Sequence, residues 1–280
     1  MTVLMPTQKT AANASVSTPS PQNPLAFRCR NLSVELGSGT ARRRIIEGLS
    51  FDVPKGQFVC ILGESGVGKT TLLRVFGGLA SASGGSIELD GAPVIGPPKA
   101  AVFVFQNYAA SLLPWRTALR NVEIGLEASL SKAERRERAL AALRQVNLGE
   151  RVNDYPRQMS GGMQQRVQIA RALAVGPQLL LMDEPFGALD AMTRESLQVE
   201  LRRLQKVTGA TIIFITHDVD ESVFLADRLV VLKGKPASIG LDLLSSLPDE
   251  RDQIKTKETP AYLELRHTLY EMLRGKGASA

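Results

Sequence analysis

Alternating apolar and polar residues predict a chain of mixed strands and helices. Residues 27–36 and 45–53 alternate as strands of an antiparallel sheet, with a polar turn at 37–44 between them. Residues 57–62 are continuously apolar, which is typical of a buried parallel strand, and residues 69–76 follow as a helix. Further strands are expected at 86–89, 101–105, 178–182, 211–216 and 228–233.

Helical periodicity separates the later strands. Helices are expected at 161–174, 193–207 and 219–226. A C-terminal helix gathers several apolar residues on one face, which we attribute to packing: Tyr262, Leu265, Leu269, Met272 and Leu273. Strands that alternate with helices predict an α/β fold with a parallel sheet.

Residues 107–160 interrupt this alternation. Helical patterns cover 117–129 and 132–146, and strand patterns are absent, so we expect a mostly helical insertion. The insertion would belong to one domain at 25–240. Residues 1–24, rich in Thr, Ser, Ala, Asn and Pro, are expected to form a disordered tail, and 241–280 a C-terminal extension with one helix.

The composition is ordinary for a soluble globular protein. Of the 280 residues, 44% are hydrophobic and 22% charged, and no stretch approaches the roughly 18 apolar residues of a membrane span. The net charge is +6, and its densest cluster, Arg42 to Arg44, is better explained as a solvated turn than as a nucleic-acid site. Cys29 and Cys60 lie in apolar surroundings and are expected to be reduced core residues.

The strongest chemical motif is GESGVGKT, from Gly63 to Thr70, which fits the phosphate-loop pattern G-x-x-x-x-G-K-[ST] between a strand and a helix. Its glycines let backbone N–H groups surround phosphate oxygens, and the helix N-terminus points at the same oxygens. Lys69 would add charge for the β- and γ-phosphates, and the Thr70 hydroxyl a Mg²⁺ ligand. We therefore predict that the chain binds and hydrolyses Mg-ATP. The nucleotide-binding residues of this segment would be Gly63, Glu64, Ser65, Gly66, Val67, Gly68, Lys69, Thr70 and Thr71.

Two other segments suit the same nucleotide. An apolar strand ends in Asp183 and Glu184, of which the first can hold Mg²⁺ and the second can polarise an attacking water. A Ser-Gly-Gly turn that starts at Ser160 opens a helix and makes an anion-binding N-terminus. The alternative for the first is a solvated acidic turn, which we disfavour because a phosphate loop predicts an acid at such a strand end. The alternative for the second is a simple helix cap, which would be preferred if the turn stood alone.

Over about residues 25–233 the chain resembles the nucleotide-binding subunit of ABC transporters. The resemblance is carried by the order of the phosphate loop, Gln106, Ser160-Gly161-Gly162, Asp183-Glu184, Ala188-Leu189-Asp190 and His217. It implies an α/β fold with a P-loop NTPase (RecA-like) core, an N-terminal antiparallel β subdomain and a helical insertion.

The resemblance also assigns catalytic and metal roles. Glu184 would be the catalytic carboxylate, acting with Lys69 and with His217, the switch that senses the γ-phosphate. A lone histidine is otherwise a common structural side chain, but its setting in Ile-Thr-His-Asp favours the switch. Gln106 would bind nucleotide as the Q-loop glutamine, and the Mg²⁺ ligands would be Thr70, Gln106 and Asp183.

In this family the Ser-Gly-Gly turn that starts at Ser160 is called the signature. A signature on the helical insertion cannot reach the phosphate loop of its own chain. Two chains are therefore expected to face each other head to tail around two ATP molecules. Asp190 would lie at this dimer interface. The signature residues that contact the ATP of the opposite subunit would be Ser160, Gly161, Gly162, Met163 and Gln164. ATP binding then stabilises closure and hydrolysis releases it, a cycle that a membrane protein can use for alternating access.

The implied partners are a second copy of this chain or a paralogous ATPase subunit, a membrane permease and, indirectly, an extracytoplasmic solute-binding protein, with no nucleic acid. The chain would lie peripherally on the cytoplasmic face of the inner (plasma) membrane. The loop from Phe105 to Trp115 and residues 216–226 are similar to the nitrate/sulfonate/taurine importer group, which implies uptake of a small anionic solute such as nitrate, sulfonate or taurine. Trp115 either packs within the insertion or forms an exposed apolar surface for a permease helix.

Two other classes compete with this interpretation. A soluble ABC-type ATPase acting on nucleic acid or the ribosome usually has long coiled-coil insertions or two cassettes, whereas this chain has one phosphate loop and a short insertion. A P-loop kinase or GTPase leaves the Ser-Gly-Gly turn unexplained. One departure from the family pattern is that no aromatic residue stands near Leu36 to stack on adenine, so we predict weaker discrimination between ATP and GTP.

Overall fold

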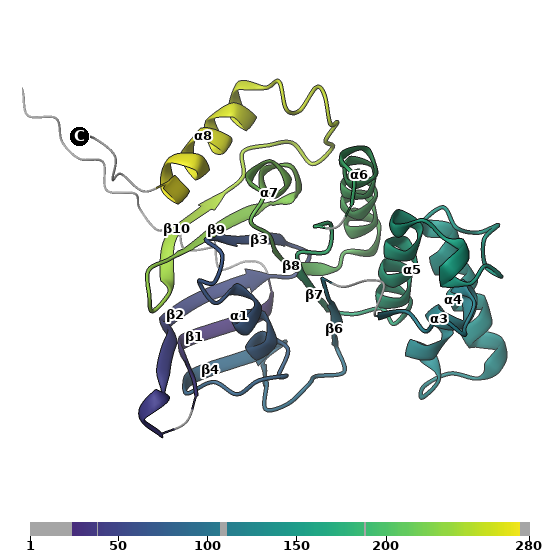
Figure 1. The fold of residues 1–280 in the computed structure, drawn as a ribbon, viewed down its shortest axis with the longest axis horizontal. Coiled ribbons are helices and arrows are strands. Elements are labelled where there is room, and N and C mark those ends of the chain that lie inside the picture. Colours follow the sequence, from purple (N-terminus) through teal and green to yellow (C-terminus); the bar gives the residue numbers. More distant parts are fainter. Residues whose placement is uncertain (1–23, 38, 107–110, 188, 275–280) are drawn as a thin grey trace, which may run out of the picture.

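The computed structural model describes residues 24–37, 39–106, 111–187 and 189–274. Its N-terminal part is a four-stranded antiparallel sheet in the order β2-β1-β4-β5 (Figure 1). The first two strands are the predicted pair, and the third is the strand expected at 86–89. The strands are β1 (Leu25–Leu36), β2 (Arg43–Pro54), β4 (Gly84–Leu89) and β5 (Ala92–Pro93), with a 3-10 turn η1 (Gly39–Ala41) between the first two.

The second sheet has six strands in the order β10-β9-β3-β8-β7-β6. Five of them run parallel: β3 (Phe58–Gly63), β6 (Ala101–Val104), β7 (Leu179–Asp183), β8 (Thr211–Ile215) and β9 (Arg228–Lys233). Every residue of β3, β7 and β8 is buried, which explains their continuous apolar sequences. The carboxyl ends of these strands therefore meet at one edge of the sheet.

Strand β10 (Ser238–Leu244) was not predicted and pairs antiparallel with β9. Its sequence nevertheless alternates, with apolar Ile239, Leu241 and Leu243 separated by Gly240 and Asp242, so the local pattern for this strand was present and was missed. Two charge-assisted bonds attach it to the sheet, because the Arg228 guanidinium donates to both carboxylate oxygens of Asp242 at 2.6 and 2.5 Å. The strand is therefore the second arm of a hairpin whose turn covers residues 234–237.

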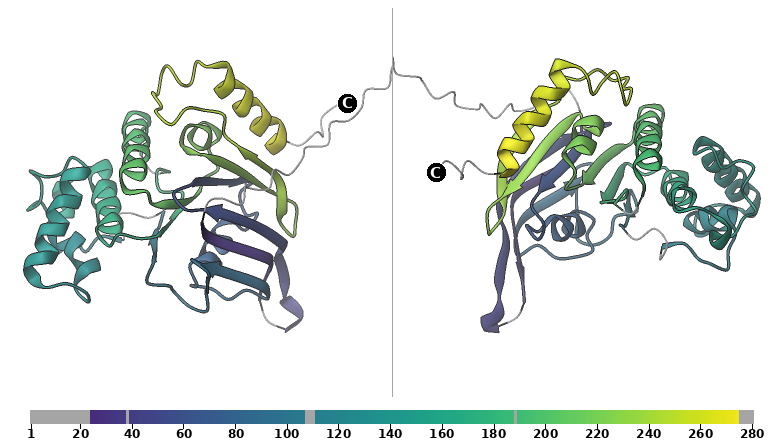
Figure 2. Two further views of the ribbon diagram at one scale, coloured as in Figure 1. Left: turned by 180° about the vertical axis from the view of Figure 1, so that it is seen from behind. Right: turned by 45° about the horizontal axis from the view of Figure 1, so that its top comes forward.

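The six-stranded sheet separates two core clusters, as its strand β3 shows. Val59 and Ile61 pack in the cluster that contains helix α1 (Lys69–Phe76) and the antiparallel sheet. Phe58, Cys60 and Leu62 point to the other face. That face is covered by the remaining core helices, α5 (Gly161–Ala174), α6 (Ala191–Thr208), α7 (Val219–Leu225) and α8 (Pro260–Arg274). Figure 2 shows α8 lying beside β9 and α7.

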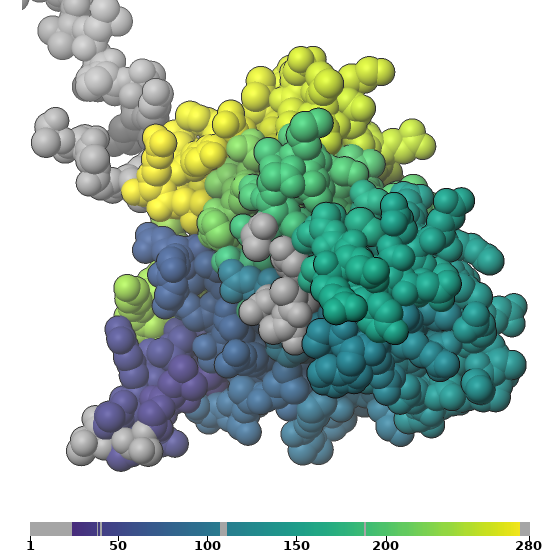
Figure 3. All heavy atoms as spheres, turned by 45° about the vertical axis from the view of Figure 1, so that its right-hand side comes forward, coloured from purple at the N-terminus to yellow at the C-terminus, as the bar shows by residue number. Residues whose placement is uncertain are grey.

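The insertion is helical, as predicted, and forms a lobe beside the core (teal in Figure 3). Its elements are α3 (Ala118–Glu123), the 3-10 turn η2 (Ile124–Leu126), α4 (Lys132–Gln145) and the 3-10 turn η3 (Pro156–Gln158). The helix expected at 117–129 is shorter, because its α-helical part ends before Gly125, a residue type that favours helix ends over helix interiors. The segment continues only as a 3-10 turn.

Other expectations from the sequence have clear outcomes. Cys29 and Cys60 are buried free thiols, and burial raises the pKa of Cys29 to about 12. Tyr262 and Leu269 of α8 are buried, which confirms a packing face. Within the described ranges, no helix is both long and apolar enough to cross a membrane. The predicted tail lies outside those ranges except for Pro24.

Candidate nucleotide site

The phosphate loop joins the carboxyl end of β3 to the first turn of α1. Gly66 and Gly68 have positive φ angles of 76° and 108°, which favour glycine. A Cβ atom on Gly68 would also lie 2.6 Å from Ile45 Cγ2, so β2 presses against the loop there. Gly68 caps α1 without a side-chain hydrogen bond, which leaves the N-terminal N–H groups of the helix available to an anion.

Lys69 lies folded against the loop. It is buried, and its Nζ donates to the carbonyl oxygens of Gly63 at 2.7 Å and Glu64 at 3.1 Å. Burial lowers the pKa of this ammonium group, while the charges of Glu184 and Asp183 oppose the shift. The group is thus a positive charge held within reach of the loop and of two carboxylates.

Thr70 and Asp183 meet at the start of α1 and the end of β7, where the Thr70 hydroxyl donates to Asp183 Oδ1 at 3.2 Å. Burial raises the pKa of Asp183, and the hydrogen bond from Thr70 counteracts this. A hydroxyl and a carboxylate side by side are oxygen donors of the kind Mg²⁺ prefers when phosphates and water complete its shell. The residues present therefore fit this ion.

Glu184 contacts two residues from distant parts of the sequence. Gln106 Nε2 donates to Glu184 Oε2 at 3.3 Å, and His217 Nδ1 lies 3.1 Å from the same oxygen. The backbone of Glu184 has a φ of 42°, a costly conformation for a residue with a side chain. Its N–H donates to Ile215 O at 2.9 Å, so the neighbouring strand β8 holds this strained turn in place.

The loop that carries His217 runs directly into α7. Asp218 N–H donates to Thr216 Oγ1 at 3.0 Å, and the Asp218 carboxylate accepts from Glu221 N–H at 3.0 Å as the helix cap. Arg194 of α6 forms an ion pair with Asp218 at 3.5 Å. Sequence reasoning missed Arg194 and Glu221, since charged residues on amphipathic helices give no sign that they face a site. Both line the recess beside Glu184 and His217.

The signature residues form the first turn of α5, away from the phosphate loop. Ser160 caps the helix by accepting from Met163 N–H at 3.3 Å, and Gln164 Nε2 donates to Met159 O at 3.2 Å. Gly161 is half-buried and Gly162 is buried. Within the described ranges, no hydrogen bond or ion pair joins this turn to the loop starting at Gly63.

The remaining predicted site residues are more exposed. Glu64, Ser65 and Gly66 form the exposed crest of the phosphate loop, whereas Val67 is buried beneath it and Thr71 lies in the first turn of α1. Asp190 is exposed and caps α6 by accepting from Thr193 N–H at 3.0 Å, which lowers its pKa. Ala188 lies outside the described residues.

Three further predictions concern exposed segments. Leu36 is half exposed at the end of β1, with Arg43 as its partner on β2. Arg42 and Arg44 form ion pairs with Glu35, so two of the three residues of the basic cluster are paired. Trp115 is 71% exposed, which excludes its packing within the insertion. It lines an open hollow of about 500 Å³ with residues that include Arg120, Arg136 and Tyr155.

Comparison with known proteins leads to the same family as the phosphate loop and the residues around Glu184. The family profile described as ABC transporter matches residues 46–187. The chain belongs to the ABC transporter family. The resemblance carried by the sequence motifs is thereby confirmed, and so is the expected nucleotide-hydrolysing class: this ABC protein is an ATPase subunit.

Relatives of this ABC ATPase share most of its length. The bicarbonate transport ATP-binding protein CmpD of Synechocystis sp. is 42% identical over 279 residues, 98% of each chain. The taurine import ATP-binding protein TauB of Yersinia pestis is 49% identical over 195 residues, 69% of this chain and 76% of the relative. Among solved structures, the dimeric post-hydrolysis state of the ATP-binding cassette MJ0796 with ADP and Pi has a TM-score of 0.68 and 32% identity, covering 78% of this chain and 98% of that one. The P-loop fold with an antiparallel β subdomain is thus confirmed.

Proposed function

We propose that this ABC ATPase hydrolyses Mg-ATP at sites completed by a second subunit and thereby powers uptake of a small anionic solute through a membrane permease. The observation that supports the catalytic part is the shared position of Glu184 Oε2, which contacts both Gln106 and His217 beside the Thr70–Asp183 pair. These side chains come from the first turn of α1 and from the carboxyl ends of β6, β7 and β8 or the residues just after them.

Each residue then has a physical role. The N–H groups at the start of α1 and the Lys69 ammonium bind the phosphate oxygens. Glu184 orients and polarises the attacking water, while His217 and Gln106 fix the direction of its carboxylate. Thr70, Asp183 and Gln106 would hold Mg²⁺, which when bound neutralises charge on the β- and γ-phosphates. Because the strained turn at Glu184 is set before ATP arrives, little reorganisation is needed.

The signature explains why we propose a paired site. Ser160 to Gln164 present a capped helix N-terminus on α5 that is not joined to the chain's own phosphate loop. An anion-binding helix end so placed suits ATP held by a second, antiparallel copy or a paralogue, with the exposed Asp190 at the seam. The MJ0796 cassette is dimeric in its ADP-bound and Pi-bound state, which supports this arrangement.

We also propose the remaining partners and the location. The relatives named for bicarbonate transport and taurine import support an importer for a small solute with an anionic group, such as nitrate, a sulfonate or taurine. A permease and, through it, an extracytoplasmic solute-binding protein complete such a system, with this subunit on the cytoplasmic membrane face. We assign residues 25–240 to the ATPase domain, with the insertion at 107–160, and 241–280 to an extension, although strand β10 crosses position 240.

The test is the Glu184→Gln variant. The variant should still bind ATP. Without the carboxylate charge, its hydrolysis rate should fall by about 10²–10⁴-fold, since general-base catalysis contributes that much. The ATP-bound variant should then accumulate as a dimer, which light scattering after gel filtration would measure. Lys69→Ala should instead weaken ATP binding itself, measured by titration calorimetry.

Glu137→Gln is the matched control for this test, because Glu137 is exposed on α4. It should behave as the unmodified protein. Turnover near normal in Glu184→Gln, or a variant that stays monomeric with saturating Mg-ATP, would contradict the assignment. The rival function in nucleic-acid or ribosome remodelling predicts co-purification with those partners rather than with a permease.

A further inference from the structure

Helix α7 and the loop of His217 form one mechanical unit. The helix starts two residues after His217, and Asp218 binds both the hydroxyl of Thr216 and the N–H of Glu221. A helix of seven residues is too short to hold its conformation without tertiary contacts. The position of His217 against Glu184 therefore depends on whatever fixes α7.

The C-terminal segment, residues 245–274, fixes the last turn of α7. Arg251 has a side chain only 1% exposed, and its guanidinium donates to Val223 O at 3.3 Å and Phe224 O at 2.7 Å. These are carbonyls at a helix C-terminus, where a cation is favourable. Burial lowers the pKa of Arg251 to about 10, so the group stays charged at neutral pH.

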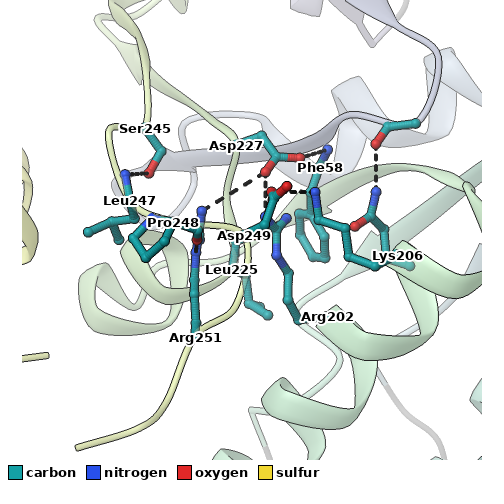
Figure 4. Close-up of polar contacts among 12 residues, drawn as sticks. Phe58, Arg202, Lys206, Leu225, Asp227, Ser245, Leu247, Pro248, Asp249 and Arg251 are labelled. Atoms are coloured by element: carbon teal, nitrogen blue, oxygen red, sulfur yellow. Dashed lines mark hydrogen bonds and ion pairs between the residues drawn. The ribbon is translucent and has the colours of Figure 1, made fainter. Parts of the chain in front are cut away.

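A charge network around two buried guanidinium groups supports this anchor (Figure 4). Arg202 of α6 donates to Leu225 O at 3.2 Å and to Asp227 at 2.6 Å. Asp227 also accepts from Phe58 N–H at 2.9 Å, and it lies 3.9 Å from Arg251. The close-up shows Asp227 and Asp249 between the guanidinium groups from α6 and from the C-terminal segment. The end of α7 is thus tied to β3, the strand that leads into the phosphate loop.

The same segment fixes the first turn of α7. Tyr262 is 1% exposed, and its hydroxyl donates to Asp220, with Oδ1 at 3.1 Å and the carbonyl oxygen at 3.0 Å. Burial raises the pKa of this phenol, so it remains a donor at neutral pH. Arg266 adds an ion pair to the Asp220 carboxylate at 2.8 Å.

A third connection runs to the middle of α7. Gln253 Nε2 donates to Gln198 Oε1 at 3.0 Å, and Gln198 Nε2 donates to Glu221 Oε1 at 3.3 Å. Residues 245–274 therefore reach both ends of α7 directly and its centre through α6. We propose that this segment is an intramolecular clamp that positions His217 against Glu184, with Tyr262 and Arg251 as its positioning residues. The proposal rests on the catalytic role proposed for His217.

The clamp has a specific consequence for catalysis. A small misplacement of a catalytic group costs far more in rate than in substrate binding, because phosphate contacts on the loop remain intact. Release of one end of α7 should therefore lower kcat for ATP hydrolysis and leave KM almost unchanged. A segment that only stabilised the fold would instead reduce the amount of active protein and leave the kcat of the folded fraction unchanged.

The test uses Tyr262→Phe in the full chain, which removes the hydroxyl and keeps the ring. Thr268→Val is the matched control on the same helix, because it also removes one hydroxyl and that hydroxyl bonds Glu264 O of α8 itself. We expect kcat to fall about tenfold in Tyr262→Phe with KM changed less than twofold, and no change in Thr268→Val. Arg251→Lys, whose shorter side chain cannot place its ammonium where one guanidinium nitrogen of Arg251 bonds both carbonyls, should act in the same direction from the other end of α7, whereas Arg274→Lys should not.

Nuclear magnetic resonance separates positioning from stability. The chain has two histidines, His217 and the exposed His267 on α8, so both rings give resolvable signals. Tyr262→Phe should shift the ring signals of His217, whereas Thr268→Val should leave them in place. Unchanged His217 signals and unchanged kcat in both Tyr262→Phe and Arg251→Lys would overturn the clamp. Normal hydrolysis by His217→Ala would overturn the proposed role of His217, while the ring shift would still report on the clamp.

Discussion

At the scale of single residues, the site combines strain, burial and charge. Glu184 is held at a φ of 42°, and burial raises the pKa of Asp183. Glu221 of α7 lines the recess beside Glu184 and is only 5% exposed; burial raises its pKa to about 7, with the Asp218 charge adding to the shift and Arg194 opposing it. The charged form of Glu221 is thus unfavourable in the folded protein.

This burial predicts a pH-dependent stability. The pKa of this carboxyl is about 7 in the folded protein and 4.5 ordinarily. Its contribution to the free energy of unfolding is therefore largest below pH 4.5 and is lost as the pH rises through 7. Over this pH range the free energy of unfolding that Glu221 contributes changes by about 3 kcal/mol. Glu221→Gln should therefore gain stability relative to the unmodified protein between pH 5 and pH 8, measured by urea unfolding. Glu264→Gln, an exposed residue on α8, is the control, and an equal difference at both pH values would contradict the prediction.

At the scale of elements, the signature helix is positioned by close packing against α6. A Cβ atom on Gly162 would lie 2.4 Å from Thr193 Cγ2, closer than real contacts allow. Thr193 itself follows the Asp190 cap in the first turn of α6. The two first turns, one carrying the signature and the other Asp190, therefore keep a fixed relation that a side chain at Gly162 would disturb.

A paired substitution tests this packing. Gly162→Ala should force the first turn of α5 away from α6 and reduce ATP-driven dimerisation of the Glu184→Gln protein by about tenfold, since overpacking costs roughly 1–3 kcal/mol. Thr193→Ser removes the obstructing methyl group and keeps the hydroxyl. The double variant should recover dimerisation, measured by light scattering against ATP concentration. Failure of this rescue would show that the contact does not set the helix position.

At the scale of the whole molecule, the nucleotide site and the insertion lie on different parts of the fold (Figures 1 and 3). The insertion carries the exposed Trp115 beside its hollow, with Arg120, Arg136 and Tyr155 nearby. An apolar ring surrounded by polar groups is typical of an interaction surface. We interpret this surface as the place where a short permease helix docks.

Docking predicts a separation of two activities. Trp115→Ala should leave ATP hydrolysis by the isolated subunit unchanged and weaken permease-stimulated hydrolysis by about tenfold or more, the range for a central aromatic at an interface. Ile95→Ala is a suitable control, because Ile95 is an apolar residue that is 92% exposed outside the insertion. Stimulation measured with permease in lipid nanodiscs should remain normal in that variant. Unchanged stimulation in Trp115→Ala would remove the docking role.

The sequence by itself determined the phosphate loop, the parallel strands and the core helices. These features depend on neighbouring residues: a contiguous glycine-rich motif between β3 and α1, continuous apolar runs for buried strands, and a 3.6-residue period for helices. The limits of α1, α5 and β9 agree with their predicted ranges for the same reason. Family resemblance added roles for Gln106 and His217 that no local pattern could supply.

Only the tertiary structure decided how distant residues meet. Gln106 and Glu184 are 78 positions apart and Thr70 and Asp183 are 113 apart, and they come together because parallel strands place their carboxyl ends at one edge. The bonds from Tyr262 and Arg251 to α7 likewise depend on how residues 245–274 cross the surface. The sequence also left undecided whether Trp115 is buried or exposed, because a single aromatic residue shows no periodicity from which burial could be predicted.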